Sequence, residues 1–316
     1  MGKYVLKKIR NFLLVLLIAS ICVFAMVKIS GMNPVLATLG GGHLSEAALE
    51  ERMAKYGLDQ PVVLQYLYWL KNIITGNFGE SVKYKTAVTK LIKDRYLITL
   101  LLAVFSFVIA QVSGVLLGVL SALKKNTVVD KVISILTVLV FAVPVFFMGM
   151  LVILLISNKF PGISYTGSLS TLSDYVERLL PPIIIMAFHQ IALVTRVTRS
   201  SMIEQFSTDY VLALRAKGLC ERKIVFKHAL KNGIIPVLTI AALQFGSLIV
   251  GTVLIENIFS LNGLGQLLVE AVTVGDTAVI QSVSLIVIVV FQAANLIVDL
   301  LYGVIDPRIR AGQEAA

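Results

Sequence analysis

Six long and nearly uncharged apolar runs constrain this chain more than any other feature. They occupy residues 9–29, 96–123, 132–156, 179–197, 234–255 and 279–305. A helix needs about 20 mainly apolar residues to cross about 30 Å of hydrocarbon. Only 15% of the 316 residues are charged, whereas a soluble domain has about 25%. The runs therefore predict an all-α polytopic membrane protein with six transmembrane helices, and they exclude a disordered chain or a soluble enzyme.

The basic residues of the short loops predict the orientation in the membrane. Seventeen Lys and Arg residues lie on the side that holds both termini, and only Lys159 and Arg178 lie in the opposite short loops. Because cytoplasmic loops carry the excess of positive charge, both termini are expected in the cytoplasm. Segment 28–95 lies outside and is too long for this rule. Basic inner loops next to membrane lipid explain the net charge of +10. No nucleic-acid partner is therefore expected.

The chain divides into two predicted domains. Residues 1–95 form an N-terminal anchor helix and a long extracytoplasmic segment, and residues 96–316 form a five-helix core with a cytoplasmic loop at about 200–232. The first span could instead be a cleaved signal peptide. Its apolar stretch is longer than usual and no clear cleavage site follows, which favours an uncleaved anchor. In the outer segment we expect a capped helix over 45–57 and an apolar helix after Pro61.

The cytoplasmic loop has the pattern of two short helices joined by a glycine. Thr208 or Asp209 can cap a helix N-terminus, and Gly218 can end that helix where a left-handed residue is needed. The spacing i, i+3, i+4, i+7 places four residues on one face of the first helix. They are Tyr210, Ala213, Leu214 and Lys217. Glu221 begins a second helix whose residues at the same spacing are Ile224, Val225, His228 and Ala229.

This loop resembles the cytoplasmic coupling loop of ABC-importer permeases, in the form found in the oligopeptide/dipeptide/nickel family. The matching pattern is Asp209-Tyr210-…-Arg215-Ala216-Lys217-Gly218-Leu219-…-His228-Ala229-Leu230-Lys231-Asn232-…-Pro236. Further matches lie at 57–66 with the turn 76–81, at 142–146, at 256–265 and at 295–308. Two positions depart from the family. Leu212 stands where the general motif has Glu, and Asn33 stands in the Asp position of a Pro-Gly-Asp-Pro segment.

The resemblance implies a type I ABC-importer permease fold in a prokaryotic cytoplasmic (inner) membrane. It also implies four kinds of neighbour: a second permease subunit, such as a paralogue, two cytosolic ATPase subunits, an extracytoplasmic substrate-binding protein, and membrane lipid. The residues expected to couple to the ATPase are Asp209, Tyr210, Leu212, Ala213, Arg215, Ala216, Lys217, Gly218, Leu219 and Arg222. The alternative is a solvated basic loop that faces anionic lipid.

Catalytic and metal-binding motifs are missing from the sequence. The only Gly-Lys pair is Gly2-Lys3, so there is no P-loop. ATP and Mg are therefore expected to bind the partner ATPase, and this chain is expected to be neither an enzyme nor a holder of cofactors. The three histidines fall in different regions and no Cys-x-x-Cys occurs, so no metal site is expected. Cys22 and Cys220 lie in a span and in a cytoplasmic loop, so no disulfide is expected.

Polar residues within the spans should face other helices or a water path, because they are costly in lipid. The candidates for the translocation path are Gln111, His189, Gln190, Gln244, Ser247 and Asn295. The alternative role for each is interhelical hydrogen bonding. Asp299 is expected to pair with Arg196 or Arg199 near the inner face. Pro144 removes a backbone hydrogen bond in mid-span and should kink the third span, where it could act as a hinge.

The favoured cargo is a peptide, carried by one half of a pathway that opens alternately to each side. The runner-up is nickel or a metal–chelate complex, since the family includes both. A self-sufficient channel or secondary transporter belongs to a different class. It would need internal repeats or an intramembrane ion site, and the sequence contains no convincing example of either.

Overall fold

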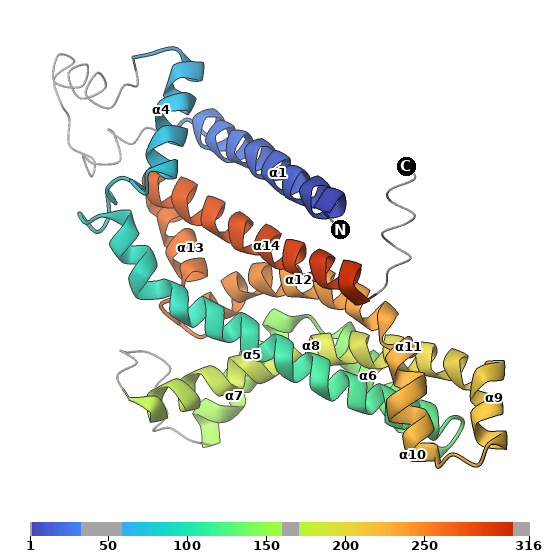
Figure 1. Cartoon of the computed structure of the whole chain (residues 1–316). Helices are drawn as coiled ribbons and strands as arrows, with labels where there is room; N and C mark the ends of the chain where they lie inside the picture. The colour runs from blue at the N-terminus through green and yellow to red at the C-terminus, as the bar shows by residue number, and fades with distance from the viewer. Residues whose placement is uncertain (1, 33–58, 160–170, 306–316) are drawn as a thin grey trace. The chain divides into compact units, whose positions relative to one another are not determined.

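The computed structural model describes residues 2–32, 59–159 and 171–305 (Figure 1). Within these ranges every regular element is a helix, apart from one isolated antiparallel bridge between Glu80 and Ala87. The chain forms two compact units. Unit 1 comprises 1–99 and 261–316, and unit 2 comprises 100–260. The helix predicted over 45–57 lies outside the described residues.

Five helices are long and apolar enough to cross a membrane. They are α1 (Gly2–Ile29), α5 (Val88–Leu123), α8 (Leu172–Phe206), α12 (Ile235–Ile258) and α14 (Thr277–Ile305). The sixth predicted span is a bent pair, α6 (Val128–Ala142) and α7 (Val145–Lys159), which meet at 96°. The structure thus has six apolar segments at the predicted places if the bent pair counts as one span.

Pro144 lies at the bend between α6 and α7, and the break is sharper than the predicted kink. Val143 is extended, with φ −88° and ψ 124°, as expected for a residue that precedes proline. The Pro144 carbonyl then accepts from the backbone N–H groups of Phe147 and Met148, at 3.0 and 3.1 Å, which starts α7. A 96° bend makes this segment either a broken span or a re-entrant loop.

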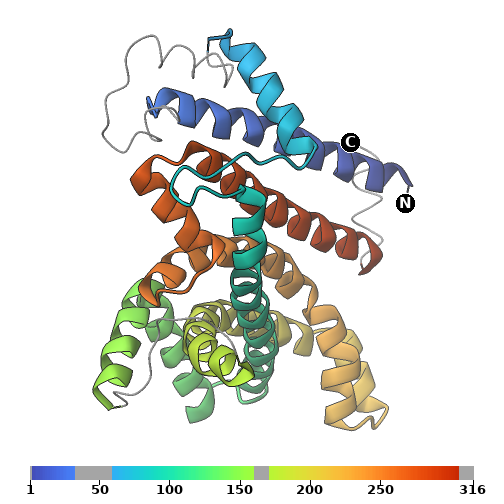
Figure 2. The same ribbon diagram turned by 90° about the vertical axis from the view of Figure 1, so that its left-hand side faces the viewer.

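In unit 1, α1 packs along α14, and α4 (Val62–Ile74) packs against α1 (Figure 2). Pro61 precedes α4, as predicted. The contact between α1 and α4 is aromatic, because the rings of Phe24, Tyr66 and Trp69 lie 5.5 to 6.0 Å from one another. The Tyr66 hydroxyl also shares a 2.9 Å hydrogen bond with Ser20. Aromatic residues of this kind suit the membrane–water interface.

Two acidic residues hold the segment before α5 in place within unit 1. Glu270, on α13 (Leu264–Val274), accepts from Lys83 Nζ at 2.8 Å and from the Tyr84 hydroxyl. Asp276 is buried and accepts from Ser81 Oγ at 2.5 Å. Burial raises the pKa of Glu270, but the hydrogen bonds from Lys83 and Tyr84 outweigh burial and leave this pKa below its ordinary value. The carboxylate is therefore charged and paired at neutral pH.

In unit 2, α5 and α8 approach each other more closely than side chains allow. A β-carbon on Gly114 would lie 2.5 Å from Cβ of Val194, and a β-carbon on Gly118 would lie 2.5 Å from Cβ of Thr198. Glycines four residues apart let two membrane helices pack backbone against backbone. The Gly-x-x-x-Gly spacing of this pair is visible in the sequence and is a further signal that these two helices pack closely.

Candidate coupling surface and translocation path

The loop between α8 and α12 forms the predicted helix–glycine–helix. Its elements are α9 (Asp209–Ala216), α10 (Glu221–Lys223), the π-helix η1 (Ile224–Ala229) and α11 (Leu230–Gly233). Thr208 is the extended residue before α9, and Gly218 has the left-handed φ of +74° that ends the helix. The Gly218 N–H donates to the Arg215 carbonyl at 2.9 Å, which closes the turn. Glu221 begins the second helix, as predicted.

One side of α9 is buried and the other is open. Val211 is fully buried, and the Tyr210 hydroxyl donates to Gln205 Oε1 at 2.9 Å. Leu212 is 54% exposed. The smaller and charged residues on its side of the helix are exposed as well. They are Asp209, Ala213, Ala216 and Lys217. The predicted face of 210, 213, 214 and 217 therefore straddles the boundary, because Tyr210 and Leu214 are half-buried.

Arg215 joins α9 to α10 through an ion pair. Its guanidinium donates to both carboxylate oxygens of Glu221, at 2.7 and 3.3 Å. This hydrogen bond raises the pKa of Arg215. Lys217 and Arg222 remain exposed, and Leu219 is half-buried. Of the three cations predicted for coupling, Lys217 and Arg222 are therefore the two that are exposed and not paired within the loop.

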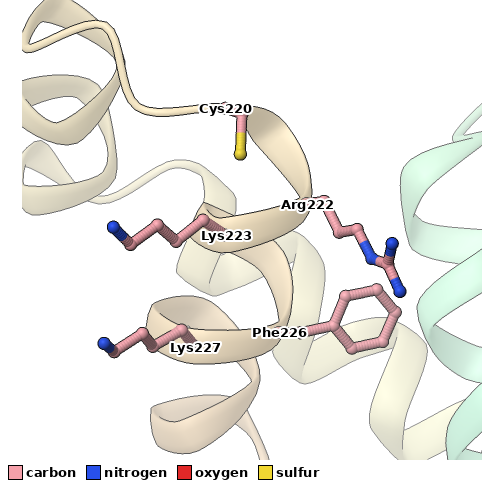
Figure 3. A pocket seen from close by; sticks show the side chains of 5 residues that line it. All are labelled: Cys220, Arg222, Lys223, Phe226 and Lys227. Atoms are coloured by element: carbon pink, nitrogen blue, oxygen red, sulfur yellow. The ribbon is translucent and has the colours of Figure 1, made fainter.

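Beside the glycine turn, an open hollow of about 480 Å³ is lined by residues around η1 (Figure 3). Arg222 and Phe226 point to one side of the helix, and Lys223 and Lys227 point to the other. Phe226 is 50% exposed. Sequence reasoning missed Phe226, although an aromatic residue among three cations on a short helix is a recognisable signal of a contact surface.

The buried side of the loop is fixed to the ends of the long helices. Val225 and Ala229 pack with Val119 and Ala122 of α5 and with Met202 of α8 in one apolar cluster. The Ser201 hydroxyl donates to the Gly233 carbonyl at 2.8 Å. The loop is therefore packed directly on the ends of α5 and α8, and α11 leads directly into α12.

A buried ion pair braces the same end of unit 2. Arg199 donates to both oxygens of Asp130, at 2.6 and 2.8 Å, and Ser121 Oγ donates to the same carboxylate at 2.5 Å. Arg199 thus has Asp130 as its partner; the expected pairing of Asp299 with Arg196 or Arg199 stays a prediction, because the Asp299 side chain is not among those described. The signal in the sequence is a single acid, Asp130, at the start of a long apolar run, which must find a cation or stay in water.

Four of the six predicted path residues form one hydrogen-bonded chain, which we name the amide ladder. Gln111 Nε2 donates to Gln244 Oε1 at 2.9 Å, and Gln244 Nε2 donates to the Gln190 carbonyl at 3.3 Å. Gln190 Nε2 donates to Ser247 Oγ at 3.3 Å, and Ser247 Oγ donates to the Gln244 carbonyl at 2.9 Å. The ladder joins α5, α8 and α12, so the alternative of interhelical hydrogen bonding also holds for these residues.

The other two predicted path residues stand apart from the ladder. The His189 ring stacks on Phe141 with centroids 4.9 Å apart, and its Nδ1 is buried without a hydrogen-bond partner among the described residues. Asn295 belongs to unit 1, and its Oδ1 is likewise buried without a partner in the part of the chain that the structure describes.

Two models of known protein families match this chain, and together they cover most of it. The model of the binding-protein-dependent transport system inner membrane component matches residues 114–311. The model of the N-terminal part of such membrane components matches residues 1–103. The chain belongs to this family of inner-membrane transport components. Its apolar helices are thus those of a multi-pass membrane protein, and its permease role implies ATPase and substrate-binding partners.

Relatives of this family member extend over its whole length. It is 35% identical to the oligopeptide transport system permease protein AppB of Bacillus subtilis, over 98% of this chain and 99% of the relative. It is 36% identical to the dipeptide transport system permease protein DppB of Lactococcus lactis, over 98% and 100%. The methionine ABC transporter MetNI, solved in inward-facing conformations, contains a similar chain. The TM-score is 0.54 at 16% identity, over 68% of this chain and 96% of that one, which confirms the ABC-importer permease fold.

Proposed function

We propose that this chain is a permease subunit of an ATP-driven importer of peptides. The observation that carries the proposal is the similarity, over 98% of the chain, to relatives named for oligopeptide and dipeptide transport. Nickel or a metal–chelate complex is the alternative cargo. A second permease subunit would complete the pathway, two ATPase subunits would bind ATP and Mg, and a binding protein would deliver the cargo outside.

Uptake by the reconstituted complex tests the cargo. The permease, its ATPase and its binding protein are placed in liposomes with labelled di- and tripeptides, Ni²⁺, or a nickel chelate. We expect ATP-dependent accumulation of peptide. Accumulation of nickel alone would overturn the peptide assignment, and peptide uptake by this chain without any ATPase would indicate a self-sufficient transporter instead.

The exposed side of α9 is, in this proposal, the part that seats in a groove of the ATPase. Leu212 offers an apolar side chain, and Ala213 and Ala216 allow a close approach by another surface. Lys217 and Arg222 lie at the edge, where charge orients a partner more than it adds affinity. Since the buried side of the loop is packed on α5 and α8, closure of the ATPases would move these helices and open the pathway to the other side.

A substitution at Ala213 tests the ATPase contact without disturbing the fold of the loop. Ala213→Arg adds a long charged side chain on the open side of α9, so we expect the variant to insert normally, to lose ATPase co-purification and to lose at least about 90% of uptake. Ala213→Ser is the matched control, because it keeps the small volume and should retain both activities. Normal uptake and normal ATPase binding by Ala213→Arg would contradict the assignment of α9 as the contact.

A further inference from the structure

The amide ladder of Gln111, Gln190, Gln244 and Ser247 lies at mid-depth in three long helices. Gln190 lies near the middle of α8 and Gln244 near the middle of α12, and Gln111 lies in the second half of α5. Only 7% of Gln190 and 3% of Gln244 is exposed. Three primary amides at this depth are costly in lipid unless each donor and acceptor finds a partner.

The ladder leaves part of its hydrogen-bonding capacity unused. A glutamine side chain has two N–H donors and a carbonyl oxygen with two lone pairs. Among the described residues, the Oε1 atoms of Gln111 and Gln190 accept no side-chain or backbone hydrogen bond, whereas Oε1 of Gln244 accepts from Gln111. The two donor bonds at 3.3 Å, from Gln244 and from Gln190, are longer than typical N–H···O bonds of about 2.9–3.0 Å. The two Oε1 atoms can therefore accept hydrogen bonds from an incoming N–H group. The two long hydrogen bonds can readily be replaced by bonds to another molecule.

The ladder reaches the surface of unit 2 at Ser247. This residue is exposed on α12, on a stripe with Leu243, Val250 and Leu254, which are 70, 63 and 57% exposed. The spacing of three or four residues places all four on one side of the helix. The Ser247 hydroxyl lies at the centre of this apolar stripe and accepts from Gln190, so the stripe lies directly beside the ladder.

A peptide backbone is the chemical match for this site. Each residue of an extended peptide carries one N–H donor and one C=O acceptor, the same amide chemistry as glutamine, repeated every 3.3–3.6 Å. Exchange of one amide hydrogen bond for another is close to neutral in free energy. The match is independent of side chains, as a transporter of varied peptides requires, and the apolar stripe would contact those side chains without selecting among them.

We propose that the amide ladder binds the backbone of the peptide in transit, with the Oε1 atoms of Gln111 and Gln190 accepting hydrogen bonds from peptide N–H groups. The proposal rests on the peptide cargo proposed above. It assigns a ligand class to the site: unmodified peptide amides, regardless of sequence. A cargo whose amide nitrogens are methylated cannot donate and should pass slowly even when the binding protein delivers it.

Uptake of two matched cargoes by the complete reconstituted transporter tests this site. The probes are tri-alanine and tri-alanine methylated on both backbone amide nitrogens, at concentrations that give equal occupancy of the binding protein. We expect the unmodified transporter to import tri-alanine at least about tenfold faster, because each lost donor removes a hydrogen bond. In Gln111→Leu and in Gln190→Leu tri-alanine should move more slowly and the ratio should fall, because each variant keeps only one of the two acceptors. Gln292→Leu, on α14, is the matched control and should keep the tenfold ratio.

The outcomes separate this proposal from the cargo assignment. Failure of the unmodified transporter to import tri-alanine at all would refute the peptide function. Peptide import with a cargo ratio near one, or with the same ratio in the two ladder variants, would refute the ladder alone. If a leucine variant does not co-purify with its ATPase, Gln111→Asn replaces it, since the amide is kept but withdrawn by one methylene group. An intermediate ratio is then expected, and an unchanged ratio would count against the site.

Discussion

Gly218 fixes the direction of the coupling loop through its backbone and not through contacts. Its φ is +74°, and a β-carbon added there would meet no atom within 4 Å. Local rules were enough to predict this residue, because a helix end needs a left-handed residue and glycine adopts that conformation freely. Arg215 and Phe226 are different. Their roles depend on the angle between α9 and α10 and on what lies beside them, which no single position in the sequence reveals.

Replacement of Gly218 separates backbone strain from steric fit. We expect Gly218→Ala to destabilise the loop by about 1–2 kcal/mol, because a β-carbon disfavours the left-handed conformation. Gly218→Asn should lose less, since asparagine tolerates this conformation. The measurements are ATPase co-purification and thermal unfolding of the detergent-solubilised protein. Equal behaviour of the Ala and Asn variants would show that backbone strain is not the operative factor.

The lowered pKa of Glu270 leads us to expect a loss of stability in acid. Its folded-state pKa lies below the ordinary value, because the hydrogen bonds from Lys83 and Tyr84 outweigh the opposing effect of burial. The stabilisation is therefore complete above the ordinary pKa of about 4.3 and is lost as the pH falls through the lower folded-state pKa. Since the pair is partly exposed, the loss should be about 0.5 kcal/mol. Thermal unfolding of the protein and of Glu270→Gln between pH 7 and pH 3 measures it, and the variant should show the smaller decrease.

At the scale of the helix, the crossing of α5 and α8 and the break at Pro144 set the shape of unit 2. The apolar runs in the sequence predicted where the long helices lie. For α12 and α14 the predicted ends agree with the structure to within a few residues. The sequence predicted only a kink at Pro144, whereas the bend is 96°. A proline removes one hydrogen bond, but how far the chain then turns depends on the packing of the two halves.

The close crossing of α5 and α8 predicts a strong effect of one added methyl group. We expect Gly118→Ala to destabilise the protein by about 1–3 kcal/mol, because its β-carbon would lie 2.5 Å from Cβ of Thr198 and 2.8 Å from the Thr195 carbonyl oxygen. Gly251→Ala on α12 is the matched control, since its nearest atom is Cε of Met186 at 4.0 Å. Thermal unfolding in detergent distinguishes the two. A Gly118→Ala variant as stable as Gly251→Ala would contradict the close crossing.

At the scale of the whole molecule, the charge distribution predicts the orientation of the chain in the membrane. Of the seventeen basic residues expected on the inner side, eight lie between Arg196 and Lys231, in and next to the loop proposed to contact the ATPase. We expect these residues to serve two physical roles. The positive-inside rule would keep the loop on the cytoplasmic side, and Lys217 and Arg222, which are exposed, would face the proposed ATPase partner.

Cys220 reports this orientation without any substitution in the loop. It is free and exposed beside the glycine turn, so a membrane-impermeant maleimide should label it in inside-out vesicles and not in intact cells. Cys22→Ser removes the other cysteine and leaves a single reporter. Bound ATPase should slow the labelling at least about threefold, because α9 and the hollow lie next to Cys220. Labelling in intact cells would refute a cytoplasmic loop, and unchanged labelling with bound ATPase would argue against a contact there.

The sequence by itself determined the class of the protein, its spans, its expected orientation and the helix–glycine–helix of the loop. These depend on hydrophobicity, charge and backbone conformation, which act over one helix or one turn. The tertiary structure alone decided which polar residues meet. Asp130 pairs with Arg199, which is 69 positions away in the sequence, and Gln111 bonds to Gln244, which is 133 positions away. A buried polar group must pair with whatever the packing places within about 3 Å, and packing is a property of several helices together.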